Sequence, residues 1–226
     1  MDNVTQTYAI HVVRSLLPAG AELEILEYPA PHPAVLVADL DGDGIPEVVG
    51  GYRANDVMHA MIVKYAYDRW VVAAHLRGPG YAIANLMAAP IVDPARNTLL
   101  IGWQIGTVWA QLDMWQADPG GLVHLTPRDI FYSKLEVGDL PDARGPDGRC
   151  EIALWVHEAG DAYRVDLWRW QGGLLKYAEA YPNYYGKKVV PYYERLVSAS
   201  PDSDVYKRHL REAKKIAEGG APFRAQ

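Results

Sequence analysis

Three segments of roughly 50 residues repeat along this chain, and the repeat constrains its fold more than any other feature. In each segment an aspartate follows the first apolar strand, at Asp39, Asp93 and Asp139. A Gly- or Asp-containing turn then separates the third strand from a fourth. The segments cover about 33–80, 81–128 and 129–181. Four short strands per repeat are typical of propeller blades. We therefore expect a mainly β fold, a propeller-like arc of about three four-stranded repeats.

The loop after the first strand, residues 39–47, carries carboxylates at alternating positions with two glycines between them. Hard cations such as Ca²⁺ bind six to eight oxygens, from carboxylates and backbone carbonyls. Glycine permits the left-handed backbone that wrapping around an ion requires. This segment, the first loop, therefore predicts a Ca²⁺ site. The expected ligands are Asp39, Asp41, Asp43, Glu47 and the backbone carbonyl of Ile45.

The spacing excludes an EF-hand, because the twelfth position counted from Asp39 is Gly50 rather than Glu. The flanking residues, 34–38 and 48–52, are apolar and often β-branched, which favours buried strands over helices. A strand–DxDxDGxxE–strand unit resembles the FG-GAP repeat of integrin α-subunit heads and of related bacterial (VCBS-type) propeller proteins. The resemblance implies a calcium-stabilised, β-propeller-like repeat. A hairpin turn that binds no metal is the alternative.

The second and third loops differ from the first. In the second loop, residues 92–98, one aspartate remains and Ile101 stands where Glu47 would be, so we expect no metal chemistry there. The third loop, residues 138–151, is longer and keeps a DGxxE ending. It offers a second, weaker metal site, or else its acids pair with Arg144 and Arg149. The candidate ligands of that second site are Asp139, Asp142, Asp147 and Glu151.

Helices are expected at both ends of the repeat region, which occupies residues 31–182. In the N-terminal segment, residues 1–30, a helix ends near Pro18 and a strand follows. In the C-terminal extension, residues 183–226, we expect a helical hairpin: a short helix over 191–197 and a second helix that begins at Ser200. We interpret this hairpin as a cap over an exposed sheet edge. A tetratricopeptide-like interaction unit is the alternative.

Composition excludes several classes of partner. The net charge is −6 with no long basic run, which argues against nucleic acid. No apolar stretch reaches the roughly 18 residues of a membrane span. The single Cys150 excludes an internal disulfide. The start of the chain lacks the pattern of a secretion signal, so we expect a cytoplasmic protein, or an extracellular or cell-surface one if a leader was removed. Nothing in the sequence predicts the oligomeric state.

The sequence contains no recognisable catalytic or cofactor-binding motif: neither G-x-S-x-G nor H-E-x-x-H occurs. The recurrent aromatics Tyr52, Trp103 and Trp155 can form a stacking platform for sugar or peptide, or packing layers between repeats. These features favour a non-catalytic, calcium-stabilised binding or adhesion module that recognises a protein or glycan. The alternative is a carbohydrate-active or other hydrolase that uses acids and aromatics on one face.

Overall fold

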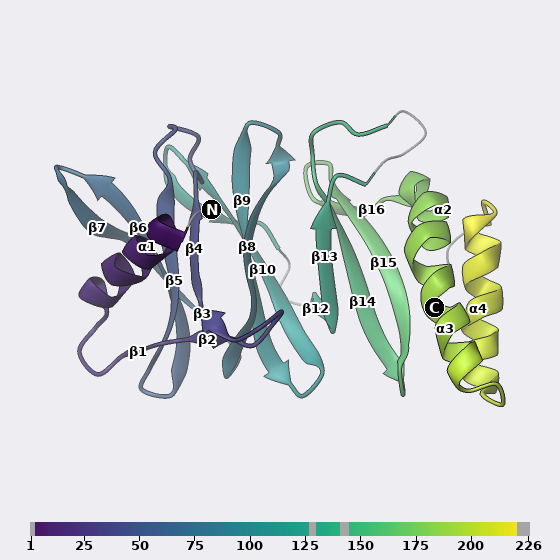
Figure 1. The fold of residues 1–226 in the computed structure, drawn as a ribbon. Coiled ribbons are helices and arrows are strands. Elements are labelled where there is room, and N and C mark those ends of the chain that lie inside the picture. Colours follow the sequence, from purple (N-terminus) through teal and green to yellow (C-terminus); the bar gives the residue numbers. More distant parts are fainter. Residues whose placement is uncertain (1–2, 127–129, 141–144, 221–226) are drawn as a thin grey trace. The chain divides into compact units, whose positions relative to one another are not determined.

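The computed structural model describes residues 3–126, 130–140 and 145–220. Antiparallel sheets dominate, with one helix at the N-terminus and a helical region at the C-terminus, which confirms the expected mainly β fold (Figure 1). The chain divides into two compact units, Met1–Phe131 and Tyr132–Gln226. Short strand β12 (Phe131–Tyr132) lies at the division. Among the described helices, none has the length and apolar character that a membrane crossing requires.

The first sheet is a meander in the first unit, and tight turns fix its register. The residues of the β5–β6 turn, Asn55 and Asp56, have φ of 49° and 60°, and those of the β6–β7 turn, Tyr67 and Asp68, have φ of 54° and 57°. Left-handed pairs of this kind match the twist of a two-residue hairpin. The strands are β4 (Val35–Ala38), β5 (Glu47–Ala54), β6 (Val57–Ala66) and β7 (Arg69–Arg77), with β1 (Glu22–Leu23) also paired to β5.

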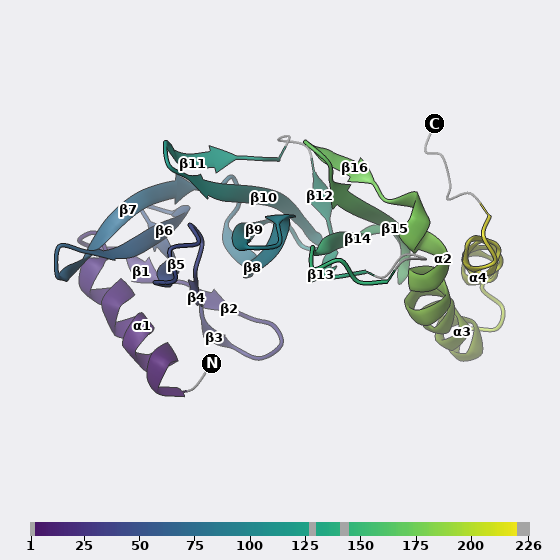
Figure 2. The same cartoon turned by 90° about the horizontal axis from the view of Figure 1, so that it is seen from above.

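Helix α1 (Asn3–Leu16) covers one face of this sheet (Figure 2). Its apolar residues, among them Val12 and Val13, pack against Val48, Met61 and Val63 of the sheet. The helix approaches closely because β5 presents glycine: a Cβ at Gly50 would lie 2.4 Å from Cγ1 of Val13. After the helix, the expected single strand is divided into β1 and β2 (Ile25–Leu26), and β2 pairs with β3 (His32–Pro33).

The second sheet also lies in the first unit and shares a core with the first sheet. Val49 and Ile62 of the first sheet are buried in one cluster with Leu99, Ile101 and Trp103 of the second. Its strands are β8 (Ala82–Asp93), β9 (Arg96–Gly106), β10 (Trp109–Asp118) and β11 (Gly121–His124). The shared core places the first loop beside the β8–β9 turn.

The second unit contains the third sheet and the C-terminal helices, and it has a core of its own. Trp155, Val165 and Leu167 of the sheet are buried against Tyr181 and Tyr185 of the helical region. The strands are β13 (Lys134–Gly138), β14 (Glu151–Ala159), β15 (Ala162–Trp170) and β16 (Leu174–Lys176).

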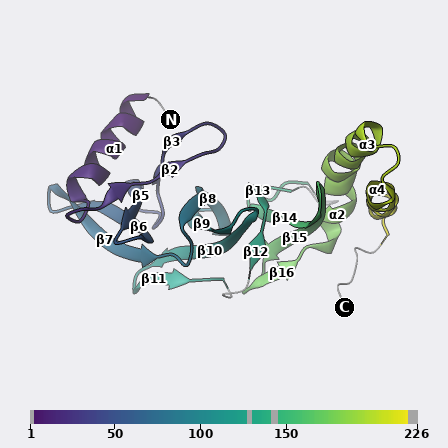
Figure 3. The same ribbon diagram turned by 90° about the horizontal axis from the view of Figure 1, so that it is seen from below.

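The helical region begins earlier than expected, and its last helix begins later. Figure 3 shows α3 and α4 side by side. The prediction that the second helix begins at Ser200 was wrong. Its N-cap is Ser203, whose Oγ accepts a hydrogen bond from Tyr206 N at 3.3 Å, while Ser200 N still donates to Leu196 O of the preceding helix. The segments are a 3₁₀ turn (Ala178–Ala180), α2 (Tyr181–Tyr184), a π-helical segment (Tyr185–Val189), α3 (Val190–Ala199) and α4 (Asp204–Ala217).

Tyrosine hydroxyls from this region bond to the free edge of β15, as the interpretation of the extension as an edge cap predicts. Strand β16 pairs only with residues 168–170 of β15. Backbone groups at alternate residues of the remaining edge are bonded by hydroxyls, as a neighbouring strand would bond them. Tyr206 Oη accepts from Asp161 N (3.3 Å), Tyr192 donates to Asp161 O (2.6 Å), Tyr193 accepts from Tyr163 N (2.8 Å) and donates to Tyr163 O (2.6 Å), Tyr185 donates to Val165 O (2.8 Å), and Tyr181 accepts from Leu167 N (3.1 Å).

Candidate metal site

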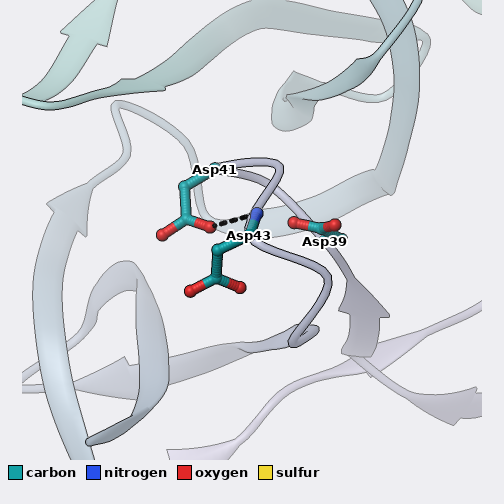
Figure 4. A group of neighbouring side chains, drawn as sticks. All are labelled: Asp39, Asp41 and Asp43. Atoms are coloured by element: carbon teal, nitrogen blue, oxygen red, sulfur yellow. Dashed lines mark hydrogen bonds between the residues drawn. The ribbon is translucent and has the colours of Figure 1, made fainter.

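The first loop wraps around its own carboxylates. Its two glycines have φ of 80° and 83°, the left-handed conformation that the sequence predicted. Asp39 Oδ1 accepts from Gly42 N at 2.7 Å and Oδ2 accepts from Gly44 N at 3.0 Å. Asp43 Oδ1 accepts from Ile45 N at 2.8 Å. These bonds turn the backbone tightly, and a further one joins Asp43 N to Asp41 Oδ1 at 3.2 Å (Figure 4).

Three carboxylates lie close together in this loop. Asp39, Asp41 and Asp43 each offer an oxygen, and these oxygens lie within 4.8 Å of one another. Oxygen-only donors suit hard divalent cations such as Ca²⁺ or Mg²⁺. Like charges held this close repel one another unless a cation lies between them. The cluster can therefore hold a metal ion.

Glu47 supplies the observation that best fits a bound cation. It is the first residue of β5 and only 3% exposed. Its Oε2 accepts from Leu40 N at 2.8 Å, whereas Oε1 is buried and accepts no hydrogen bond from any residue that the structure describes. A buried acceptor without a partner costs about 1–3 kcal/mol. Burial, together with the nearby Asp41 carboxylate, raises the pKa of the Glu47 carboxyl above its usual value. A cation placed within reach of this oxygen would satisfy it and lower the pKa of the Glu47 carboxyl.

The Ile45 side chain is 49% exposed, so this residue serves the loop through its backbone. Its N–H is used by Asp43. The role of its carbonyl as a ligand stays a prediction.

Lys64 of β6 is part of the site, and the sequence reasoning missed it. Its Nζ contacts Asp41 directly and lies 3.2 Å from Asp43 Oδ2 and 3.9 Å from Glu47 Oε1. The hydrogen bond to Asp41 raises the pKa of this ammonium further. Val48 pairs with Val63, so Lys64 lies across from Glu47 on the neighbouring strand. The ammonium therefore uses the same oxygens that a metal ion would need.

Strand register corrects the alignment of the second loop. Leu99 pairs with Trp115, so Thr98 and Gln116 hold the positions of Glu47 and Lys64. Thr98 Oγ1 donates to Gln116 Oε1 at 2.8 Å in a buried contact. The prediction that Ile101 replaces Glu47 was therefore wrong by three residues, because the loops differ in length. A neutral pair replaces the acid and the base.

The third loop repeats the hydrogen bonds of the first around a guanidinium. Asp139 Oδ2 accepts from Gly148 N at 2.8 Å, and Glu151 Oε2 accepts from Leu140 N at 2.7 Å. Arg169, at the position of Lys64, contacts Asp147 directly and has its Nε 3.6 Å from Glu151 Oε1. Of the four candidate ligands, Asp142 lies outside the described residues, as does Arg144. Arg169 pairs with Asp147 and Glu151, and this arrangement favours an ion pair over a second metal site. The pairing expected of Arg149 stays a prediction.

Glu151 makes the stability of the second unit depend on pH. Burial raises the pKa of its carboxyl from 4.5 to about 7 in the folded chain. Its stabilising contribution is thus complete below about pH 4.5 and is lost as the pH rises through 7. Between pH 5 and pH 8 we expect the wild-type unfolding free energy to fall by about 1–3 kcal/mol relative to that of Glu151→Gln. Urea titrations of both proteins check this, and parallel pH profiles would contradict it.

The three aromatic candidates do not form an exposed platform. Tyr52, Trp103 and Trp155 are 3%, 0% and 5% exposed. Their polar atoms bond within the protein: Trp103 Nε1 donates to Asp113 Oδ2 at 2.7 Å, and Trp155 Nε1 donates to Tyr184 Oη at 2.9 Å. These rings are placed for packing rather than for ligand contact.

No family model and no curated protein matches this sequence, so the first loop and its geometry carry the functional argument.

Proposed function

We propose that this chain is a non-catalytic, calcium-stabilised binding module of the FG-GAP (VCBS-type) kind, which recognises a protein or glycan. The observation that carries the proposal is the buried Glu47 Oε1, which accepts no hydrogen bond from the described residues and lies near a cluster of three aspartates. Each third of the repeat region contributes a four-stranded antiparallel meander, as a propeller blade would. The propeller-like relation between these sheets is part of the proposal.

The donor set favours Ca²⁺ as the ion. Asp39, Asp41, Asp43 and Glu47 would hold it, with the Ile45 carbonyl as a further ligand. Ca²⁺ tolerates irregular carboxylate shells, whereas Mg²⁺ requires a near-ideal octahedron and retains several waters. When bound, the ion supplies positive charge that neutralises the loop.

The first loop also contacts the second sheet, so an ion that rigidifies this loop would also stabilise its contact with that sheet. Asn97 Nδ2 donates to Asp39 O at 3.0 Å. A Cβ at Gly42 would lie 2.8 Å from Cγ of Arg96. A loop held rigid by an ion therefore fixes the β8–β9 turn as well. Surfaces fixed in advance lose less conformational entropy when a partner binds.

The hydrolase alternative has weaker support among the described residues. The group most like a catalytic relay is Asp113, His124 and Thr126. His124 Nε2 lies 3.1 Å from Asp113 Oδ1 and 3.0 Å from Thr126 Oγ1. Both contacts use the same nitrogen, so the imidazole cannot accept a proton from one group while the other orients its opposite nitrogen. This geometry suits a structural network.

A parallel pair of screens tests the proposal. The protein with calcium should bind a component of a glycan or protein array and show no turnover in a broad hydrolase panel. Asp41→Ala should weaken the array signal, whereas Asp202→Ala, at an exposed position of the second unit, should not. Turnover that disappears when an acid outside residues 39–47 is replaced would overturn the binding-module proposal in favour of an enzyme.

A further inference from the structure

A groove of about 570 Å³ opens between the first and second sheets, beside the first loop. Asp41, Asp43, Glu47 and Lys64 line one end of it. Ile62, Ala74 and Leu122 supply apolar wall. Because both sheets belong to the first unit and share one core, this groove is a defined part of the fold.

A second observation, besides the acidic cluster, marks this end as a binding site. Glu47 is 3% exposed, and its Oε1 lies 3.9 Å from Lys64 Nζ and accepts no hydrogen bond within the described part of the chain. Lys64 acts as an internal cation there, but at that distance it leaves Oε1 unsatisfied. The three carboxylates at this end of the groove therefore carry more negative charge than Lys64 alone neutralises.

The other charges of the groove are already paired. Arg96 has its Nη1 3.5 Å from Asp118 Oδ1 and its Nε 3.4 Å from Asp93 Oδ2. The four carboxylates and two basic groups that line the groove have a formal net charge of −2, which disfavours anions. A divalent ion in the first loop would make the lining formally neutral, and it would compete with Lys64 for the carboxylates and repel its ammonium.

We propose that the groove binds ligands that carry an anionic group on an apolar body, and that displaced Lys64 contacts the anion. Lys64 thus makes anion binding conditional on the cation: its ammonium is engaged by Asp41 and Asp43 without the ion and available in the groove with it. This inference rests on the proposed function, since it needs a divalent cation at the first loop. It assigns the ligand class and a specificity residue to the same site.

Anilinonaphthalene sulfonate, a fluorescent anion with apolar rings, tests the proposal on the full chain. Its dissociation constant should be at least about fivefold lower in calcium than in EDTA. Lys64→Gln should abolish that difference, whereas Lys214→Gln, whose lysine pairs with Glu194 in the second unit, should retain it. Nile red, an uncharged apolar dye, should bind equally in both buffers. Dye capture by unfolded protein would show the opposite trend, because calcium stabilises the fold.

Calcium binding is measured by titration in the same samples. This distinguishes a failure of the proposed anion groove from a failure of the proposed calcium site. Lys64→Gln should bind calcium at least as tightly as wild type, because its internal competitor is gone. Calcium binding without any change in dye affinity would overturn this inference and leave the proposed metal site standing. Equal gains for both dyes, or an unchanged calcium effect in Lys64→Gln, would also overturn it. No calcium binding by wild type would overturn the proposed function itself.

Discussion

A chain that ends at Asn183 should lose the cooperative folding of its second unit and associate in solution. The deletion removes Tyr184, Tyr185 and Tyr193 from a buried cluster and exposes Trp155 and Val165 of the third sheet. Each large apolar side chain contributes about 1.5–3 kcal/mol when buried. The loss therefore approaches the total stability of a typical domain, about 5–15 kcal/mol. It also exposes the β15 edge, and unpaired edges invite strand pairing between chains.

Size-exclusion chromatography and thermal melting of the truncated chain check this result. Tyr193→Phe separates the loss of edge hydrogen bonds from the loss of apolar burial. It keeps the buried ring and removes the hydroxyl that bonds both Tyr163 N and Tyr163 O. It should cost about 1–3 kcal/mol. The control is Tyr67→Phe, whose ring is 90% exposed and whose replacement should be neutral. A truncated chain that stays monomeric and equally stable would instead mark the extension as an independent interaction unit.

The sequence predicted the parts of the fold that local rules decide. Apolar segments and Gly- or Asp-rich turns located the four consecutive strands of each repeat to within a few residues. The start of the last helix was misplaced, because both Ser200 and Ser203 are acceptable N-caps. The choice depends on the preceding helix, which continues to Ala199 and uses Ser200 to end. The end of the preceding helix depends on its packing in the fold, and the residues around the two serines do not predict it.

The candidate site, like the fold, could be predicted only in part from the sequence. Its acids are close in sequence, so the spacing of Asp39, Asp41 and Asp43 was sufficient to bring them together. Lys64 and Arg169 reach their loops from a neighbouring strand, so only strand register identifies them. The cross-strand pairs Glu47–Lys64, Thr98–Gln116 and Glu151–Arg169 hold corresponding positions in the three sheets. An alignment anchored on loop residues alone missed this correspondence.

Asp41→Ala should abolish the stabilisation that calcium confers. A ligand that binds only the folded state contributes about 2.7 kcal/mol at a hundredfold excess over its Kd. Loss of Asp41 removes one of three converging carboxylates, so the variant should melt alike in calcium and in EDTA. The matched control is Asp147→Ala in the third loop, where Arg169 already supplies the cation. This control should keep the full calcium response.

The most direct test of the account is the melting temperature of the wild-type chain in excess calcium and in EDTA, with bound metal measured on the dialysed protein. We expect about one calcium per chain and a melting temperature about 5–10 °C higher in calcium. That single ion should be absent from Asp41→Ala. An unchanged melt in EDTA, with no bound metal on the wild-type protein, would contradict the calcium site and the binding module built on it.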